Sequence, residues 1–523
     1  MVFCVPHQTR AFALFKASNM KTEAVLFSVL VAVPLSGADH WYVGLAPKGS
    51  RIEATAVPGA SPRSPTLLLI GGLNGKQDTA ALVTQEVQRF QAMSQARRRF
   101  RLLAIPLANP ETSRLVFPPA GVAYRDNPES HALWRWIAIQ SPDLVLVAGS
   151  DDYGLVAALS QNIVAGVGRI PAQSVPAKPG MLNTALALKE IIPSDAHREI
   201  DRRHGRSPRQ LAEELAQYYG HEFDQLAYIP GMGLIGQLRL GHIADVERLV
   251  APWLDGPKAG PPGKPVSGNL AGYLVFAELA QRTHDARYAQ MVRTAASVGF
   301  TEAGEMKESM PGGSEMSDLV FMDIPILAQA GKLTGDGKYC EMAARHLTYM
   351  QKLDLRPDGL YRHSPTSADV AWGRGNAFPA LGLALTLSGC PNDHQQFPRI
   401  LQAFQQHIAV LARFQDADGL WHEVIDEPGS YPEFTATAMI GTAMLRGIRS
   451  GWLDAALYQP RIDKAWRAIL ARVGANGELI DVCESTNKQK TLEDYLHREA
   501  ILGRDTRGGG MALLFSTELA GLQ

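Results

Sequence analysis

"GNAFPALGLALTL", residues 375–387, is one of the segments that decide the fold of this chain. Gly, Ala and Leu dominate it, and it contains no charged side chain. Small residues let helices pack closely at a crowded centre, so the segment predicts a helix that is buried on all sides. Five more segments have a similar composition: "GMGLIGQLRLG" (231–241), "GNLAGYLVFAELA" (268–280), "MSDLVFMDIPILAQA" (316–330), "ATAMIGTAMLRGI" (436–448) and "GGGMALLFSTELAG" (508–521).

More polar, amphipathic segments lie between them. Examples are "ARYAQMVRTAASV" (286–298), "KYCEMAARHLTYM" (338–350), "FPRILQAFQQHIAVLARF" (397–414) and "PRIDKAWRAILARV" (460–473). Amphipathic helices can cover buried ones from outside. Six inner and six outer helices make an (α/α)6 barrel, which we predict for residues 205–523. The starts of the inner helices and the long loops before them should meet at one mouth, where an anionic substrate would bind.

The chain has a different pattern before residue 200. "TLLLIGG" (66–72), "RLLAIPL" (101–107) and "DLVLVAG" (143–149) are continuous apolar runs of strand length. Such runs are typical of strands that are buried on both faces. Helical patterns near 79–98 and 128–140 separate them. The sequence therefore predicts an α/β domain with a mostly parallel sheet over residues 39–200.

The N-terminus carries a targeting pattern. Met20-Lys21 is followed by an apolar stretch, residues 24–35, and then by the small residues Ser36-Gly37-Ala38. This is typical of a secretory signal peptide, and the apolar stretch is too short to anchor the chain in a membrane. We expect a start at Met20, a mature start near Asp39, and a secreted or periplasmic protein without a membrane span.

Charge and cysteine content exclude several classes of partner and site. The formal net charge is −1, so no global field recruits nucleic acid or an anionic membrane. Cys340, Cys390 and Cys483 match no metal motif and allow at most one disulfide. We interpret them as small buried hydrophobic residues, and we expect no metal and no cofactor.

Two carboxylates interrupt the apolar segment 316–330. Asp318 and Asp323 are five residues apart, about 140° around a helix, so they should face different surroundings. Partial burial would keep such an Asp protonated near neutral pH, because desolvation disfavours the charged form. Taken alone, Asp318 is better explained as a structural residue bonded to nearby backbone, and we interpret Asp323 as structural.

Two loops before inner helices hold further candidates. Residues 358–378 contain His363, Trp372 and Arg374, and residues 415–439 contain Trp421, His422 and Glu433. Aromatic faces suit sugar rings, and an Arg beside Gly-rich backbone at a helix start suits an anion. We interpret Trp421 and His422 as structural.

Several separated motifs resemble a known family. They are "SDLVFMDIP", "DGLYRH", "AWGRGNAF", "QDADGLW", "GSYPEFTATAM" and "RDTRGGGMALL", in this order. Residues from about 205 to 523 resemble glycoside hydrolase family 105, the unsaturated rhamnogalacturonyl and glucuronyl hydrolases, with family 88 as a more distant relative. The resemblance implies Asp318 as the catalytic acid. It places six residues around the substrate: Arg374, His363, Trp372, Phe378, Lys307 and Asn269. The chain departs from the family at "VSGN" (266–269), where Val266 replaces a second Asp.

The resemblance implies removal of a terminal 4,5-unsaturated uronic acid from oligosaccharides that polysaccharide lyases produce. The expected reaction is hydration of the enol-ether double bond. Two alternatives remain. One is a catalytically weakened carbohydrate-binding protein, which Val266 makes conceivable. The other is a different (α/α)6 glycosidase or an epimerase, for which His363 and His422 are the only nearby histidine pair.

The N-terminal domain shows a second resemblance. "LIGGLNGKQD" (69–78), "ANPETSR" (108–114) and "SPDLVLVAGSDD" (141–152) are similar to segments of zinc carboxypeptidases and related deacylases. Asn74 and Gln77 stand where that family has its His-x-x-Glu ligands, and the third segment lacks the usual His. Neutral amides are poor zinc ligands. The resemblance therefore implies a domain without metal, acting as a structural partner, a carbohydrate-binding surface or a lid.

Overall fold

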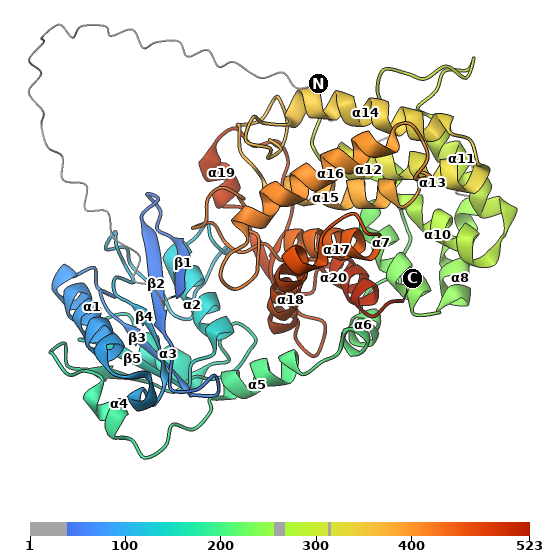
Figure 1. Ribbon diagram of the computed structural model, residues 1–523. Helices are drawn as coiled ribbons and strands as arrows, with labels where there is room; N and C mark the ends of the chain where they lie inside the picture. The colour runs from blue at the N-terminus through green and yellow to red at the C-terminus, as the bar shows by residue number, and fades with distance from the viewer. Residues whose placement is uncertain (1–38, 256–266, 312–314, 523) are drawn as a thin grey trace, which may run out of the picture. The chain divides into compact units, whose positions relative to one another are not determined.

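The computed structural model describes residues 39–255, 267–311 and 315–522 (Figure 1). The predicted signal peptide and Val266 lie outside these residues. Within them, no helix has both the length and the apolar character needed to cross a membrane.

A six-stranded sheet forms the core of the N-terminal part. Its strand order is β1-β2-β4-β3-β5-β6, and the four strands from β4 to β6 run parallel. The strands are β1 (Asp39–Leu45), β2 (Arg51–Val57), β3 (Thr66–Ile70), β4 (Arg101–Ile105), β5 (Leu144–Ala148) and β6 (Ala172–Val175). The mixed α/β sheet confirms the prediction. β1 and β2, which the sequence did not predict, extend one edge of the sheet through antiparallel pairing.

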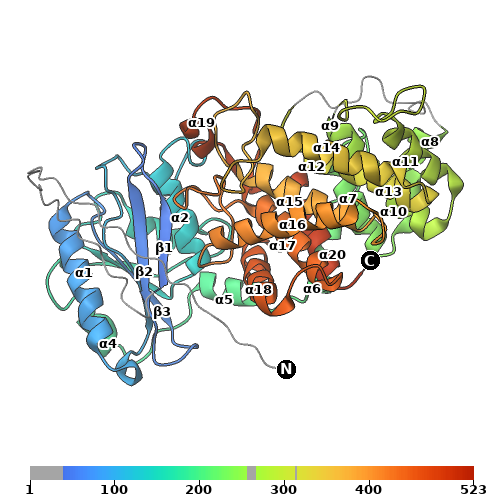
Figure 2. The same ribbon diagram turned by 45° about the horizontal axis from the view of Figure 1, so that its top comes forward.

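Helices cover both faces of this sheet (Figure 2). Leu67 and Leu69 of β3 pack with α1 and α4, whereas Leu68 and Ile70 pack with α2, α3 and α5. Alternate side chains of one strand point to opposite faces, which explains why the whole run is apolar. The helices are α1 (Gln77–Ala92), α2 (Pro128–Gln140), α3 (Leu155–Gln161), α4 (Asn183–Ala187) and α5 (Asp195–His204).

Inner helices of the C-terminal part form a closed ring. Neighbours pack in the order α7, α10, α13, α15, α17 and α20, and α20 returns to α7. These helices are α7 (Tyr228–Arg239), α10 (Leu274–Thr283) with α9 (Ser267–Gly272) before it, α13 (Ile324–Thr334) with α12 (Leu319–Met322) before it, α15 (Gly373–Leu387), α17 (Phe434–Arg449) and α20 (Thr506–Leu519).

Outer helices alternate with them along the chain. They are α6 (Pro208–Ala216), α8 (Ile243–Leu254), α11 (Ala286–Ser297), α14 (Lys338–Asp354), α16 (Phe397–Leu411) and α18 (Ala455–Arg472). The described residues thus contain six inner and six outer positions, which confirms the predicted helical barrel. A hairpin of β7 (Leu479–Cys483) and β8 (Ala500–Gly503), with the short helix α19 (Leu492–Leu496) between its strands, precedes α20.

Glycine is required where inner helices approach most closely. A Cβ atom at Gly382 of α15 would lie 2.4 Å from the carbonyl oxygen of Val320 in α12. No side chain fits there without moving the backbone, which explains the small residues of the inner segments.

The segment around Asp318 differs from the single helix that its apolar character predicts. Asp318 is the residue before α12, and the helix breaks at Asp323, where α13 begins. Pro325 causes the break, because it has no N–H to donate to the carbonyl of Phe321 one turn earlier. The break aims the two carboxylates in different directions: Asp323 Oδ2 lies 3.6 Å from His346, and Asp318 Oδ1 lies 3.8 Å from His363.

The interpretation of the cysteines as unpaired is wrong for two of them. Cys340 of α14 and Cys390, just after α15, form a disulfide with their Cα atoms 5.8 Å apart. They are 50 residues apart in sequence, so only the packing of these helices brings them together. Cys483 is free and buried, as predicted.

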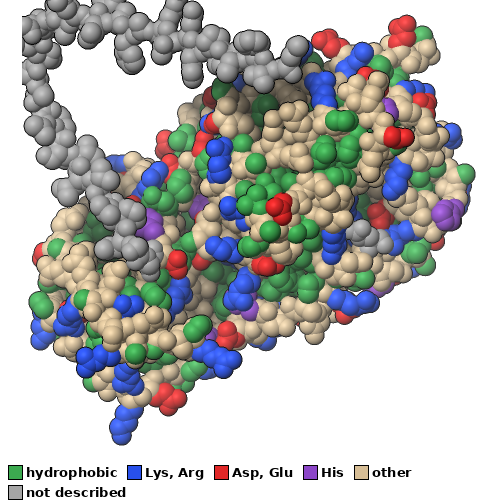
Figure 3. All heavy atoms as spheres, in the orientation of Figure 1, with side chains coloured by type: hydrophobic (Ala, Val, Ile, Leu, Met, Phe, Trp, Pro, Cys, Tyr) green, Lys and Arg blue, Asp and Glu red, His purple; other side chains and the backbone are tan. Residues whose placement is uncertain are grey.

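Charged side chains of both signs are interspersed over the helical part on the face shown in Figure 3. This mixture agrees with the net charge of −1.

Candidate active site

Asp318 lies at the start of α12 and is only 9% exposed. Its side chain caps no backbone N–H, and within the described residues its Oδ1 atom has no hydrogen-bond partner. Burial raises its pKa to about 7, although the charge of Arg374 opposes this shift. The carboxyl can therefore hold a proton near neutral pH and release it to a ligand.

His363 faces this carboxyl. Its Nε2 atom lies 3.8 Å from Asp318 Oδ1, and its Nδ1 atom lies 2.8 Å from the hydroxyl of Tyr495. The backbone N–H of Gln489 donates to the same hydroxyl, so the hydroxyl hydrogen is free to point at Nδ1. When the Tyr495 hydroxyl donates to Nδ1, the ring proton lies on Nε2, facing Asp318. Burial lowers the pKa of His363 to about 3, so the imidazole is neutral.

Trp372 and Arg374 stand at the start of α15. The Trp372 ring lies 4.5 Å from the His363 ring, and its Nε1 donates to Glu423 Oε1 at 3.0 Å. The guanidinium carbon of Arg374 lies 5.0 Å from the Trp372 ring, within range of a cation–π contact. Trp372 thus packs between His363 and Arg374.

Arg374 is buried, with 3% of its surface exposed. Its Nη1 donates to the carbonyl of Cys483 at 2.6 Å and lies 3.8 Å from Glu433 Oε1. Its Nε–H has no hydrogen-bond partner among the described residues. One edge of the guanidinium therefore supports the fold, while its Nε–H lacks a partner that the oxygen of an acid group could supply.

Phe378 belongs to an aromatic group beside Asp318. Its ring stacks on Phe321 at 5.4 Å and meets the edge of Tyr228 at 5.5 Å. Burial raises the pKa of Tyr228 to about 12, and the charges of Arg374 and Asp318 also act on this phenol. Tyr228 was not among the predicted residues, although it begins an inner helix, α7, as Asp318, Trp372 and Arg374 stand at the starts of theirs.

The structure shows no contact between Asp318 and the two remaining predicted substrate residues, Lys307 and Asn269, within the part that it describes. Lys307 donates from Nζ to the carbonyl of Val298, at the end of the outer helix α11 (2.8 Å), and none of its described contacts reaches Asp318. Asn269 lies in α9, but its side chain is outside the described residues. The structure therefore brings together Asp318, His363, Trp372, Arg374 and Phe378.

Two buried glutamates contact this group of side chains: Glu423 bonds to Trp372, and Glu433 lies near Arg374. Glu433 accepts from the backbone N–H groups of Thr435 and Ala436 and so caps α17. Burial, together with the nearby charge of Glu433, raises the pKa of Glu423 to about 8. Both side chains are fully buried, which indicates a structural role.

Trp421 and His422 hold their loop. Trp421 donates to the carbonyl of Leu411 at 2.7 Å, and His422 bonds to Ser430 and Asp416. These contacts agree with the structural interpretation.

The two positions that correspond to zinc ligands in the carboxypeptidase resemblance, where this chain has amides, follow β3. Asn74 donates to Asp152 Oδ2 at 3.3 Å, and Gln77 begins α1. No group of three or more His, Cys, Asp or Glu side chains suited to a metal ion occurs in the described part of the chain.

Comparison with known proteins supports the C-terminal assignment. Residues 269–523 match the model of Glycosyl Hydrolase Family 88. The Unsaturated rhamnogalacturonyl hydrolase YesR of Bacillus subtilis is 32% identical over 152 residues, which cover 29% of this chain and 41% of that protein. An Unsaturated 3S-rhamnoglycuronyl hydrolase of Formosa agariphila is 28% identical over 170 residues, covering 29% and 45%. The chain thus spans less than half the length of these relatives.

Solved structures show the same fold. A possible member of the GH105 family from Salmonella enterica superimposes with a TM-score of 0.51 at 22% identity, covering 64% of this chain and 96% of that one. A possible member of the same family from Klebsiella pneumoniae superimposes with a TM-score of 0.50 at 22% identity, again covering 64% of this chain and 96% of that one. The resemblance predicted from the sequence is confirmed for the C-terminal region.

Proposed function

We propose that this protein is a glycoside hydrolase that removes a terminal 4,5-unsaturated uronic acid from oligosaccharides. The observation that carries the proposal is the buried carboxyl of Asp318, with a pKa of about 7 and a neutral His363 beside it. The names of the relatives, which include unsaturated rhamnogalacturonyl and rhamnoglycuronyl hydrolases, support the substrate class.

A single acid can perform this reaction. Protonated Asp318 gives its proton to C4 of the enol ether, and positive charge develops at C5. Water adds to C5 and returns a proton to the Asp318 carboxylate. The resulting hemiketal opens to a ketone at C5, and the hemiacetal formed at C1 releases the remaining sugar as an alcohol. An ordinary glycosidase would need a second carboxylate flanking the bond.

Neighbouring side chains have separate roles in this proposal. The Nε edge of Arg374 binds the uronate carboxylate. The rings of Trp372 and Phe378 border the sugar, and the Nε2–H of His363 stabilises the Asp318 carboxylate after proton transfer.

We further propose export to an oxidising compartment, and a supporting role without metal for the N-terminal domain. The disulfide between Cys340 and Cys390 supports export, because such bonds persist outside the cytosol. The amide side chains of Asn74 and Gln77 support a domain without metal, because amides are poor zinc ligands.

Loss of ultraviolet absorbance tests the reaction, because hydration destroys the enol ether. The full chain is incubated with lyase-generated oligosaccharides from pectin, ulvan and glycosaminoglycans. Turnover of at least one set is expected. Val266 favours the second candidate, a carbohydrate-binding protein, which would bind such a set and leave its absorbance unchanged.

A further inference from the structure

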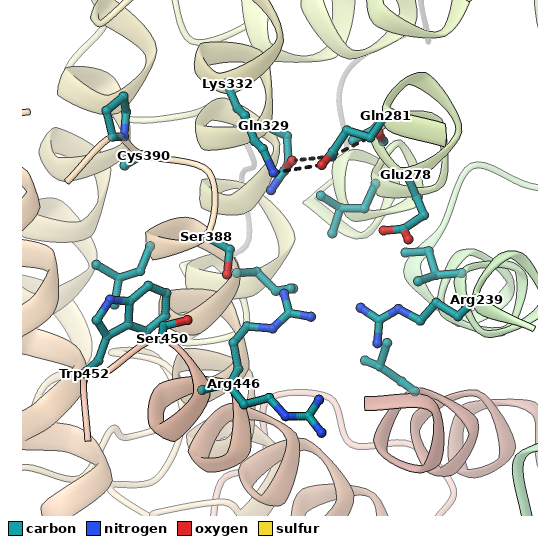
Figure 4. A pocket seen from close by; sticks show the side chains of 18 of the residues that line it. Arg239, Glu278, Gln281, Gln329, Lys332, Ser388, Cys390, Arg446, Ser450 and Trp452 are labelled. Atoms are coloured by element: carbon teal, nitrogen blue, oxygen red, sulfur yellow. Dashed lines mark hydrogen bonds between the residues drawn. The ribbon is translucent and has the colours of Figure 1, made fainter. Parts of the chain in front are cut away.

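A pocket lies at the end of the barrel where the inner helices finish (Figure 4). Its volume is about 700 Å³. Helix α15 joins the two ends, with Arg374 in its first turn and Leu387 at the pocket. Thirteen residues of helix span roughly 20 Å. This basal pocket is therefore distinct from the site around Asp318.

Three arginines at the pocket surround one carboxylate. Arg239 Nη1 and Arg446 Nη2 both donate to Glu518 Oε2, at 3.0 and 2.6 Å. Arg449 donates to the carbonyls of Glu518 and Leu519 at the end of α20. Burial by itself would raise the pKa of Glu518, but Arg446 and Arg239 lower it to about 2. The carboxylate is fully charged and still cannot balance three cations.

Among the described residues, Glu278 is the acid that lines the pocket, and it is already paired. Glu278 pairs with Arg282 at 2.7 Å, and Lys332 donates to the neutral amide oxygen of Gln281 at 2.8 Å. Four cations, Arg239, Arg446, Arg449 and Lys332, thus line the pocket with one carboxylate, Glu278, among the described residues, while Glu518 is fully buried against the arginines. The partial negative charge at helix C-termini offsets part of this excess and does not remove it.

One arginine at the pocket has a buried donor without a partner. Arg239 is 8% exposed, and its Nε–H has no hydrogen-bond partner within the described residues. Figure 4 shows its guanidinium directed across the pocket. An unsatisfied buried N–H is costly, and the oxygen of an anion would satisfy it.

The rest of the wall suits a sugar more than a bare ion. Hydroxyls, an amide and an indole line the pocket: Ser388, Ser450, Gln329 and Trp452. Hydroxyls and amides can bond to sugar hydroxyls, and an indole can pack against a sugar ring. We propose that the basal pocket binds an anionic saccharide of one or two units through its carboxylate. This proposal does not depend on the reaction at Asp318.

Calorimetric titration of the full chain with glucuronate tests the site, with inorganic sulfate and neutral glucose as comparisons. The variant is Lys332→Ala, because Lys332 is exposed and its loss should leave the fold intact. Lys352→Ala is the matched control, an exposed lysine on the outer helix α14 that does not line the pocket. Loss of one charge-assisted bond should raise the Kd for glucuronate about tenfold in Lys332→Ala only.

Only the binding event that Lys332→Ala weakens reports the basal pocket, because a uronate at Asp318 would be unaffected. The proposal is supported if glucuronate binds more tightly than glucose and if Lys332→Ala removes this preference. Equal Kd values for both lysine variants overturn it. Binding of sulfate without binding of glucuronate also overturns it, since the pocket would then hold only an inorganic ion.

Discussion

His363 Nε2 lies 3.8 Å from Asp318 Oδ1, and the two residues are also joined through the backbone, because Ser317 N–H donates to the carbonyl of His363 at 3.0 Å. The loop before α15 and the start of α12 are therefore fixed against each other. The acid keeps one orientation relative to its neutral neighbour, which preorganises it for proton transfer.

Asp318→Asn should lower kcat by on the order of a thousandfold or more, because the amide has no acidic proton to give. The fold and most of the substrate affinity should remain. Activity and binding are measured on the purified variant, with Asp369→Asn, an exposed aspartate of the loop before α15, as the control. Retained turnover in Asp318→Asn would show that the acid is elsewhere.

The pH profile of kcat/KM should have one limb near neutrality. The pKa of Asp318 is raised from 3.8 to about 7, so the active protonated form exists below this pH and is lost as pH rises through it. Activity should fall about tenfold per pH unit above 7. His363 should add no limb between pH 5 and 7, because its pKa is lowered to about 3. A rate that increases above pH 7 would contradict the acid role.

The same pKa shift affects stability. A raised carboxyl pKa favours the protonated folded state, so the contribution of Asp318 is fully present below pH 3.8 and is lost as pH approaches 7.

Tyr495→Phe should lower kcat about tenfold and leave KM nearly unchanged. The change keeps the ring and removes the hydroxyl that holds the His363 tautomer. The imidazole N–H that faces the Asp318 carboxylate is then no longer fixed in place, so the Asp318 limb in the pH profile should move to higher pH. Tyr458→Phe on the outer helix α18 is the control. A rise in KM alone would indicate that Tyr495 touches substrate and does not position His363.

Motifs could predict Asp318, His363, Trp372 and Arg374, because each lies in a segment that the family resemblance covers. Tyr495 could not be found in this way. It lies in α19 between β7 and β8, more than a hundred residues after His363, and only the folded hairpin brings it there.

Composition predicted the inner helices and the buried strands, since burial on all sides excludes charge. Contacts between segments that are distant in the sequence have no comparable signal in the composition. The disulfide of Cys340 and Cys390 and the edge strands β1 and β2 depend on tertiary packing. Alternation in "RIEATAV" (51–57) was the one available sign of β2.

Purified protein should contain no stoichiometric zinc in its N-terminal domain. Asn74 and Gln77 offer amides where His and Glu would bind the metal, and amides compete poorly for zinc. Elemental analysis after purification without chelators measures this directly. One tightly bound zinc per chain would overturn the interpretation of a domain without metal.

Arg374→Lys should lower kcat/KM by on the order of tenfold to a hundredfold. Lysine keeps the positive charge near Glu433, but it loses the planar fork and the Nε donor that would bind the uronate. A charge-assisted hydrogen bond contributes about 1.5–3 kcal/mol, which sets this range. Arg374→Ala should lose more activity, and it should also destabilise the fold by about 3–5 kcal/mol, because Glu433 is left buried without its cation.

A substrate whose carboxylate is a neutral methyl ester separates the binding role of Arg374 from its structural role, since the group that the guanidinium would bind is then absent. With Arg374→Lys, kcat/KM for the uronate substrate should fall severalfold more than kcat/KM for its methyl ester. The Tm should stay close to that of the unmodified protein. Equal losses for both substrates would mean that Arg374 only holds Cys483 and Glu433 in place and does not bind the acid.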